Sequence, residues 1–549
     1  MLDAFDTKAA GPTALKSHLG EDGKGADTLM WVQEQIFGHR YVEEQLPYML
    51  VLEVLSICRV LQIGDDGKPY GETRIFTQRG HTPDDHESIV IPMVRSVALR
   101  YILFKDMSLD LIAKNERIAP QDRFDAWVDA LNRGFANEVR IGVVNFAYLK
   151  KRFDDRFEDA RQAVRILKGL ELDVLNNRRY TSKFLAPRGP SLLLNDVNLK
   201  FVADRSFFGR GGEMIYLMLN RSALSEEVAS LVRKSFLSDT DPAEKLAERL
   251  VPDTADRTAG GQIGYLPLGR HPAYDRLAED WKAVLSLRSL PAPQKFEPLF
   301  RMTALNLVCY FADRAREVSG NAVDPIPLDM TGGRNANLRD VSKNYLNRHR
   351  QVIEDAVETH IRERIGYVQG WLSANSHGDR RIASDMAVEA IVKTFDAKRW
   401  AEKAVQSEGV REPEAWLNAF ISAAKRRDRN SVSSMLSPLG QNAGFVVARR
   451  SAGTWFSASD ELLEALVLAV VRGPITVADF LERLYDRYGI VIGPTEQRRA
   501  FAEPPCDIAA FEENLREFEK RLTGLGYVKR LSDDCAFVSN VYCLDGNPA

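Results

Sequence analysis

The sequence predicts a mainly α protein with multi-helical N-terminal and central lobes and a smaller C-terminal α+β domain. Apolar residues recur at helical spacing through most of the chain before residue 440, and strand patterns are few there. After residue 444 the local pattern changes, and helix and strand signals alternate. The 549 residues are enough for three or four domains, at about 150 residues for each domain.

The composition is that of an ordinary globular protein. Hydrophobic residues make up 45% of the chain and charged residues 28%, and the formal net charge is −3, so no overall basic excess points to nucleic acid. Five scattered cysteines, an odd number, argue against a disulfide framework and favour a reducing compartment. The longest apolar runs are too short to cross a bilayer and the first residues lack the pattern of a secretory signal, so we expect a cytoplasmic protein without membrane contact.

Helices account for most of the first 430 residues. The spacing of apolar residues predicts them over 27–59 (broken at Pro47), 89–110, 124–133, 157–175 and 296–318, the last of these deep in a helical core. Short strand patterns occur at 191–194 and 200–202. A Gly- and Pro-rich stretch at 254–271 and a Ser-, Gly- and Asn-rich stretch at 430–444 look like linkers. We therefore expect a helical N-terminal lobe with minor strands (1–253), a helical central lobe (254–430) and a C-terminal domain (431–549).

The C-terminal domain follows local rules closely. Two β-branched runs, at 445–449 and from Gly453, precede helices whose starts have the pattern of capping boxes, Ser457-x-x-Asp460 and Thr476-x-x-Asp479. Asp507 can cap a third helix. Its apolar stripe, spaced by three and four residues, consists of Ile508, Phe511, Leu515, Phe518, Leu522 and Leu525.

Two strands at 527–531 and 536–542 follow the third helix, and three helices followed by a β-hairpin is the element order of a winged helix. The outer face of the third helix carries both signs of charge, and carboxylates disfavour entry into a DNA groove. We therefore expect this face to bind a protein partner, or to be a solvated surface without a partner. The partner-binding candidates are Glu513, Arg516, Glu517 and Lys520.

Positive charge gathers locally in spite of the near-neutral total. The candidates for sequence-independent contact with DNA phosphates are Lys425, Arg426, Arg427, Arg429, Arg449, Arg450, Arg334, Arg339 and Lys343. A run of like charges is also typical of a solvated helix face, and this alternative stays open for each cluster.

Catalytic motifs are missing from the sequence. It has no P-loop, no HExxH and no GxSxG. The glycine-rich stretch 208–213 precedes an apolar helix and has the features of an anion cradle or of a tight turn, and HTPDDHE (81–87) holds metal-ligating residue types in a polar loop. We expect no catalytic residue, no metal and no cofactor. A divergent metal-dependent nuclease stays open as an alternative, because carboxylate and lysine combinations occur along the chain.

Three segments resemble large bacterial proteins of anti-phage defence islands, of the methylation-associated defence type: RRYTSKFLAP (178–187), DRSFFGRGGEMIYLMLNRS (204–222) and FEENLREFEKRLTGLGYVKRLSDDCAFV (511–538). The resemblance implies a cytoplasmic protein that works with an ATPase, methyltransferase or nuclease of the same system. It carries no catalytic motif over to this chain.

The sequence therefore predicts a non-catalytic adaptor of a DNA-directed defence assembly. The winged helix would bind a partner protein and the basic clusters would add non-specific affinity for DNA. The alternatives are a metal-dependent nuclease subunit targeted by the winged helix and a sequence-specific DNA-binding protein.

Overall fold

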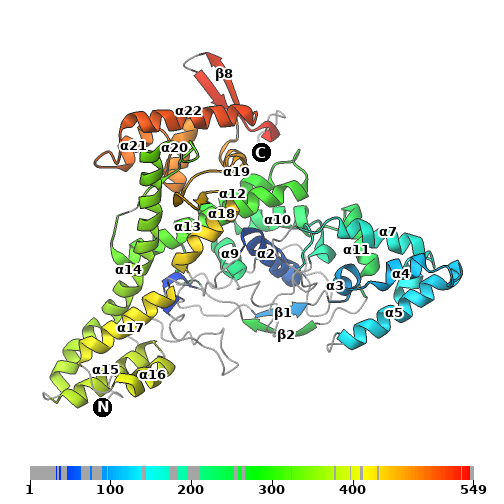
Figure 1. Cartoon of the computed structure of the whole chain (residues 1–549), viewed down its shortest axis with the longest axis horizontal. Helices are drawn as coiled ribbons and strands as arrows, with labels where there is room; N and C mark the ends of the chain where they lie inside the picture. The colour runs from blue at the N-terminus through cyan, green and yellow to red at the C-terminus, as the bar shows by residue number, and fades with distance from the viewer. Residues whose placement is uncertain are drawn as a thin grey trace.

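The computed structural model is mainly helical, which confirms the predicted class (Figure 1). It describes residues 32–33, 36–38, 46–62, 75–76, 90–94, 97–138, 144–172, 183–193, 211–252, 257–262, 266, 268–322, 324–375, 379–395, 397–408, 412–428, 432–532 and 535–543. Within these residues, no helix is both long and apolar enough to cross a membrane.

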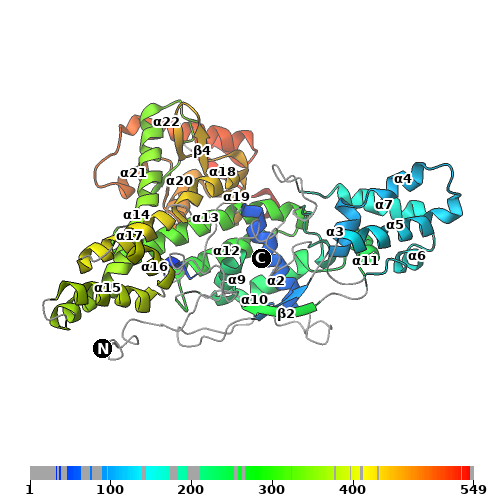
Figure 2. The same ribbon diagram turned by 60° about the horizontal axis from the view of Figure 1, so that its bottom comes forward.

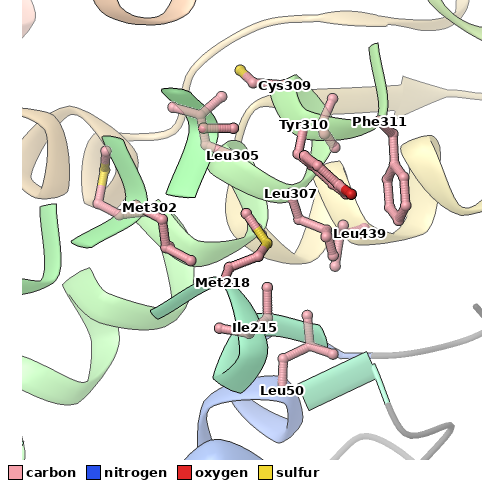
Figure 3. Packing of buried hydrophobic residues seen from close by; sticks show 14 of the residues in the cluster. Leu50, Ile215, Met218, Met302, Leu305, Leu307, Cys309, Tyr310, Phe311 and Leu439 are labelled. Carbon is pink, nitrogen blue, oxygen red and sulfur yellow. The ribbon is translucent and has the colours of Figure 1, made fainter. Parts of the chain in front are cut away.

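The centre of the molecule is α13 (Ala292–Ser319), which is buried on most of its circumference. The prediction of a core helix over 296–318 is therefore confirmed. Figure 3 shows how its side chains meet Leu50, Met218 and Leu439 from three other helices. The helices of this central bundle are α2 (Pro47–Gln62), α9 (Gly211–Arg221), α10 (Ser225–Phe236), α12 (Pro272–Leu285) and α18 (Ser434–Ala443). The helix α19 (Asp460–Val470) of the C-terminal module packs against α12 and α13.

An N-terminal lobe lies to one side of this bundle, at the right of Figure 1, and has a hydrophobic core of its own. Trp127 is fully buried at its centre, where its indole nitrogen donates to Asp106 over 2.9 Å. The lobe consists of α3 (Val97–Phe104), α4 (Ser108–Lys114), η3 (Pro120–Asp122), α5 (Arg123–Glu138), α6 (Tyr148–Arg152), α7 (Phe157–Lys168), η5 (Pro190–Leu192) and α11 (Pro242–Leu250).

Two strands correct the sequence interpretation. β1 (Val90–Val94) pairs antiparallel with β2 (Arg257–Gln262), although residues 89–110 read as one helix and 254–271 as a linker. The run before Arg95 contains Val90, Ile91 and Val94, and a short apolar run with β-branched residues fits a strand as well as a helix. Its partner strand has a Gly-rich sequence, which gives no strand signal by itself. The strand predicted at 191–194 overlaps η5, and 200–202 lies outside the described residues.

A helical arm projects from the central bundle, at the lower left of Figure 1. Its longest member is α14 (Ala336–Asn375), a helix of 40 residues that also packs along α13. α15 (Arg380–Phe395), α16 (Lys398–Glu408) and α17 (Pro413–Asp428) complete the arm, and α17 packs against both α14 and α15.

The stretch expected to be a linker at 430–444 contains helix α18. Met435, Leu436 and Leu439 are buried in the central core, so apolar burial overrides the Ser- and Gly-rich composition. Gly440 lets the following strand approach closely, because a Cβ at this position would lie 2.4 Å from Val446 Cγ2. Gly444 then ends the helix in the left-handed conformation, with φ of 93°.

The C-terminal module stands at the top of Figure 1 and contains each of the three helices and the hairpin that the sequence predicts. Its strands form a sheet of order β6-β9-β8. Thr476 and Asp479 form the predicted capping box, and Asp507 caps the third helix. The elements are α19, β6 (Ile475–Thr476), α20 (Val477–Tyr488), β7 (Ile490–Val491), α21 (Pro494–Ala500), α22 (Ile508–Gly524), β8 (Val528–Ser532), β9 (Cys535–Val538) and η7 (Val541–Cys543).

One predicted cap is wrong. The box Ser457-x-x-Asp460 does not form, because α19 starts at Asp460 and its N-cap is Ser459, whose hydroxyl accepts from the Leu462 amide. The Ser457 hydroxyl instead donates to the Asp329 carbonyl over 2.7 Å. A tertiary hydrogen bond therefore replaces the local one.

The central bundle and the C-terminal module share one continuous hydrophobic core. β3 (Ile326–Pro327) pairs in parallel with β7, and a buried polar network ties α20 to α12 and α13. The core thus extends across the positions 253 and 430, and the three-domain division stays a prediction. Figure 2 shows the module directly on the bundle, with α13 beneath it.

Candidate nucleic-acid interface

The buried carboxylate of Asp329 organises the loop that leads into α14. It accepts from the Thr331 amide over 2.8 Å, from the Thr331 hydroxyl over 2.6 Å and from the Gly333 amide over 2.7 Å. The fourth donor is Nε1 of Trp455 on strand β5 (Gly453–Phe456), at 2.9 Å. Because one carboxylate binds both segments, the loop before α14 and the hairpin of β4 (Val446–Arg449) and β5 are held side by side.

This arrangement brings together basic residues that are over 100 positions apart in the sequence. A Cβ on Gly332 would lie 3.7 Å from Arg449 Nη2, and a Cβ on Gly453 would lie 3.3 Å from Lys343 Nζ. A Cβ on Gly333 would likewise lie 3.8 Å from Arg339 Cδ. We call this set the composite basic surface, and its members are Arg334, Arg339, Lys343, Arg449 and Arg450.

Two of these five cations have carboxylate partners. Arg334 pairs with Glu517 over 2.8 Å, and Arg339 pairs with Asp340 over 3.2 Å. Arg449 lies over the Trp455 ring, 5.8 Å from its centroid, and stays exposed, as does Arg450 in the hairpin turn. Most of the positive charge of the composite basic surface is therefore open to solvent.

The second basic cluster is not part of this surface. Lys425 on α17 binds Glu358 over 3.0 Å and Asp355 over 3.5 Å, so it joins α17 to α14. Asp355 follows Lys343 by twelve residues on α14, which is about 18 Å along the helix axis. Arg426 is exposed, Arg427 lies on α17 without a described side chain, and Arg429 lies outside the described residues.

The predicted partner-binding face of α22 is half covered by its own chain. Glu513 accepts from the Asn335 amide group over 2.8 Å, and Glu517 pairs with Arg334. Arg516 and Lys520 are exposed. The two carboxylates therefore hold α22 beside the loop before α14, and the two cations face solvent.

The sequence interpretation missed Asn514, which is fully buried on α22. Its Oδ1 accepts from the Met330 amide over 2.7 Å, and its Nδ2 donates to the carbonyls of Leu328 and Ile492 over 2.8 and 2.9 Å. A signal was present, because position 514 continues the apolar stripe at three residues from Phe511 and four from Phe518. A polar residue inside a buried stripe indicates a side chain that satisfies backbone groups.

The first turn of α9 binds a carboxylate from another part of the chain. The amide of Gly212 donates to Glu53 Oε2 over 2.8 Å, and Glu53 is only 4% exposed. A negative charge at a helix N-terminus is favourable, and here Glu53 supplies it. The sequence allowed an anion to bind at the glycine-rich stretch 208–213. In the structure, the first turn of α9 binds the carboxylate of Glu53.

Metal and nucleophile chemistry finds little support in the described residues. They contain no group of three or more His, Cys, Asp or Glu that could hold a metal ion, and 81–87 lies outside them. Burial raises the pKa of the Cys309 thiol to about 11 and also raises the pKa of Cys58. Both thiols are therefore protonated at neutral pH, and a protonated thiol is a poor nucleophile.

The composite basic surface and α22 lie almost wholly in one recognisable stretch of sequence. Residues 336–538 match the family model of methylation-associated defense system protein MAD7. The match confirms the resemblance to methylation-associated defence proteins for this part of the chain and indicates a role in a defence system. The MAD7-like segment includes α14, the arm, the β4–β5 hairpin and the C-terminal module through β9, while Arg334 precedes it by two residues. No curated protein and no solved structure matches the chain.

Proposed function

We propose that this protein is a non-catalytic adaptor of a methylation-associated defence system that contacts DNA through the composite basic surface. The observation that carries the proposal is the convergence of two basic segments on a single surface, where Lys343 of α14 is half-buried and Arg449 and Arg450 of the β4–β5 hairpin are exposed. Lys343, Arg449 and Arg450 pair with no carboxylate among the described residues. Such cations gain most from phosphate contacts, because binding releases condensed counterions.

The contact proposed is with the DNA backbone and not with base edges. A three-residue turn that carries Arg450 and a helix flank that carries Lys343 offer point charges, without the row of side chains that direct readout needs. Affinity should therefore depend strongly on salt and weakly on sequence. Sequence or methylation specificity would come from a partner of the same system.

The test is a salt titration of binding to fluorescent duplex DNA, followed by anisotropy. Lys343→Ala/Arg449→Ala/Arg450→Ala is expected to weaken binding and to reduce the slope of log K against log salt by about 3, because up to three phosphate contacts are lost. If these three cations do not contact DNA phosphates, their removal should leave the slope nearly unchanged.

The control variant removes the same charge elsewhere. Lys114, Arg117 and Arg133 are exposed residues of the N-terminal lobe, and K114A/R117A/R133A should retain the wild-type slope. Equal slopes for the wild-type protein and the K343A/R449A/R450A variant would contradict the DNA contact. Loss of slope only in Lys425→Ala/Arg426→Ala would move the contact to α17.

We further propose that the C-terminal module is a winged helix that binds a partner protein. The element order α19, β6, α20, β7, α21, α22, β8, β9, which includes the three helices and the hairpin, and the sheet order β6-β9-β8 support this proposal. Since Glu513 and Glu517 bind residues 334 and 335, the part of α22 left for a partner is the side that carries Glu512, Arg516 and Lys520.

This docking is tested by co-expression with each protein encoded in the same defence system, followed by size-exclusion chromatography. Arg516→Glu/Lys520→Glu should abolish co-elution with the partner, while Lys114→Glu/Arg117→Glu, the matched charge reversal on the N-terminal lobe, should not. Co-elution that survives reversal at α22 would show that the partner binds elsewhere.

A further inference from the structure

A cavity of about 1020 Å³ lies where α12, α19, α20 and η7 meet, between the central bundle and the C-terminal module. It is separate from the composite basic surface and shares no residue with it. Among the described residues that line it, five are cations and only Glu279 is a carboxylate. The cations are Lys282, Arg288, Arg472, Arg483 and Arg487.

Nearby acids offset only part of this positive charge. Lys282 pairs with Glu227 over 2.5 Å, and Arg487 pairs with Glu279 and with the buried Asp280, each over 2.6 Å. Three carboxylates therefore oppose five cations. Arg288 and Arg483 are exposed and form no ion pair with the residues that the structure describes.

The other two arginines are held rigidly in the wall. Arg472 donates to the carbonyls of Leu468 and Ala469 over 3.1 and 2.8 Å, at the C-terminal end of α19. Burial lowers the pKa of its guanidinium, because desolvation disfavours the charged form, and a bound anion would compensate that loss. Arg487 is fixed by Asp280, which also accepts from the Tyr488 hydroxyl over 2.8 Å. These donors are pre-oriented before any ligand arrives.

The rest of the wall is apolar or carries hydroxyls. Leu224, Ala283, Leu287 and Val470 line the cavity together with Ser286 and Ser289. A ligand that matches both parts has a strongly anionic end and a flat, largely apolar end. The volume is at the upper end of the range of about 300–1,000 Å³ for small-molecule sites, large enough for one nucleotide.

We infer that this cavity binds a nucleoside phosphate, with the phosphates at Arg288, Arg483 and Arg487 and the base against the apolar wall. Arginine suits phosphate because its planar donors can bind two oxygens at once. The site lies between the bundle and the C-terminal module, so an occupied cavity would also bind the two parts together. The inference does not depend on the DNA contact.

The inference is tested by isothermal titration calorimetry of the full chain with ATP, inorganic pyrophosphate and adenosine. ATP should bind, pyrophosphate should bind more weakly, and adenosine should bind at least about tenfold more weakly than ATP, because it lacks the charge. Arg288→Ala/Arg483→Ala should weaken ATP binding about tenfold or more. Arg117→Ala/Arg498→Ala removes two exposed arginines outside the cavity and should leave ATP binding unchanged.

A second variant keeps the test valid if the double alanine variant unfolds. Ser289 is exposed and lines the cavity, so Ser289→Trp fills the space without removing a cation, and it should also abolish ATP binding. The inference fails if millimolar ATP and pyrophosphate do not bind, if adenosine binds as tightly as ATP, or if the folded variants bind ATP like the wild-type protein. It also fails if a 5′-phosphorylated oligonucleotide binds through Arg288 and Arg483 and ATP does not.

Discussion

The indole nitrogen of Trp455 donates a 2.9 Å hydrogen bond to the carboxylate of Asp329, and both side chains are fully buried. This bond connects the β4–β5 hairpin to the loop that starts α14, across 126 positions of sequence. The same carboxylate accepts three further hydrogen bonds from Thr331 and Gly333. Asp329 therefore fixes the geometry of the composite basic surface without being part of it.

Replacing Asp329 with alanine should lower the free energy of unfolding by about 3 kcal/mol or more, because four donors, three of them buried, lose their acceptor. Trp455→Phe removes one donor and should cost about 1 kcal/mol from the lost hydrogen bond. Urea unfolding followed by circular dichroism measures both. Asp340→Ala, at an exposed neighbour, should stay within about 0.5 kcal/mol, and an equal loss in this control would contradict the special role of Asp329.

The second prediction concerns Asn514, whose side chain hydrogen-bonds the backbone of residues 328 and 330 and so holds α22 against the segment before α14. Asn514→Leu keeps a similar volume but leaves the Met330 amide and the carbonyls of Leu328 and Ile492 without their partner. The expected loss is about 3 kcal/mol, measured by urea unfolding. Arg516→Leu, two residues further on the exposed side of α22, is the control and should be nearly neutral. A stable N514L variant would show that water satisfies these groups.

The local elements of the C-terminal module could be predicted because its signals are local. The Thr476–Asp479 box and the Asp507 cap each depend on residues within one helical turn, and both are found in the structure. The Ser457 cap failed because its hydroxyl binds Asp329, which is far away in sequence. Local rules cannot foresee such a competitor.

The candidate site could be predicted only as separate clusters. Arg339 and Arg449 stand out as basic residues in the sequence, but nothing local indicates that they share a surface. Their proximity depends on the bond between Asp329 and Trp455, and an Asp and a Trp carry no pairing signal along the chain. The same reason explains why β1 and β2, more than 160 residues apart, went unrecognised.

The network around Asp280 gives a third prediction. The Tyr488 hydroxyl donates to this buried carboxylate over 2.8 Å, and Asn306 donates to it over 2.6 Å. Tyr488→Phe should destabilise the protein by about 2 kcal/mol, because it leaves part of a buried carboxylate unsatisfied. Tyr485→Phe is the control on the same helix, because the Tyr485 ring is half-buried beneath Arg499. Thermal unfolding that shifts equally in both variants would contradict a specific role for Tyr488.

His349 predicts how stability depends on pH. Burial lowers its pKa to about 3, and the positive charge of Arg316 adds to this effect. Its Nδ1 lies 2.8 Å from the Tyr345 carbonyl and donates to it, and Nε2 faces Arg316 at 3.4 Å, so the neutral ring fits both neighbours.

The direction follows from which state takes up the proton. The pKa of a histidine in the unfolded chain is about 6.5, so between about pH 6.5 and pH 3 the unfolded state binds a proton that the folded state refuses. Stability is therefore retained above pH 6.5 and is lost as the pH falls below it, by up to about 1.4 kcal/mol per pH unit for His349.

His349→Gln retains a donor and an acceptor but does not titrate. Urea midpoints between pH 7.5 and 5 should fall less steeply in this variant than in the wild-type protein. Some dependence of the urea midpoint on pH should remain in the variant, because burial also lowers the pKa of His360 to about 3. An identical dependence on pH in the two proteins would show that His349 is protonated in the folded state.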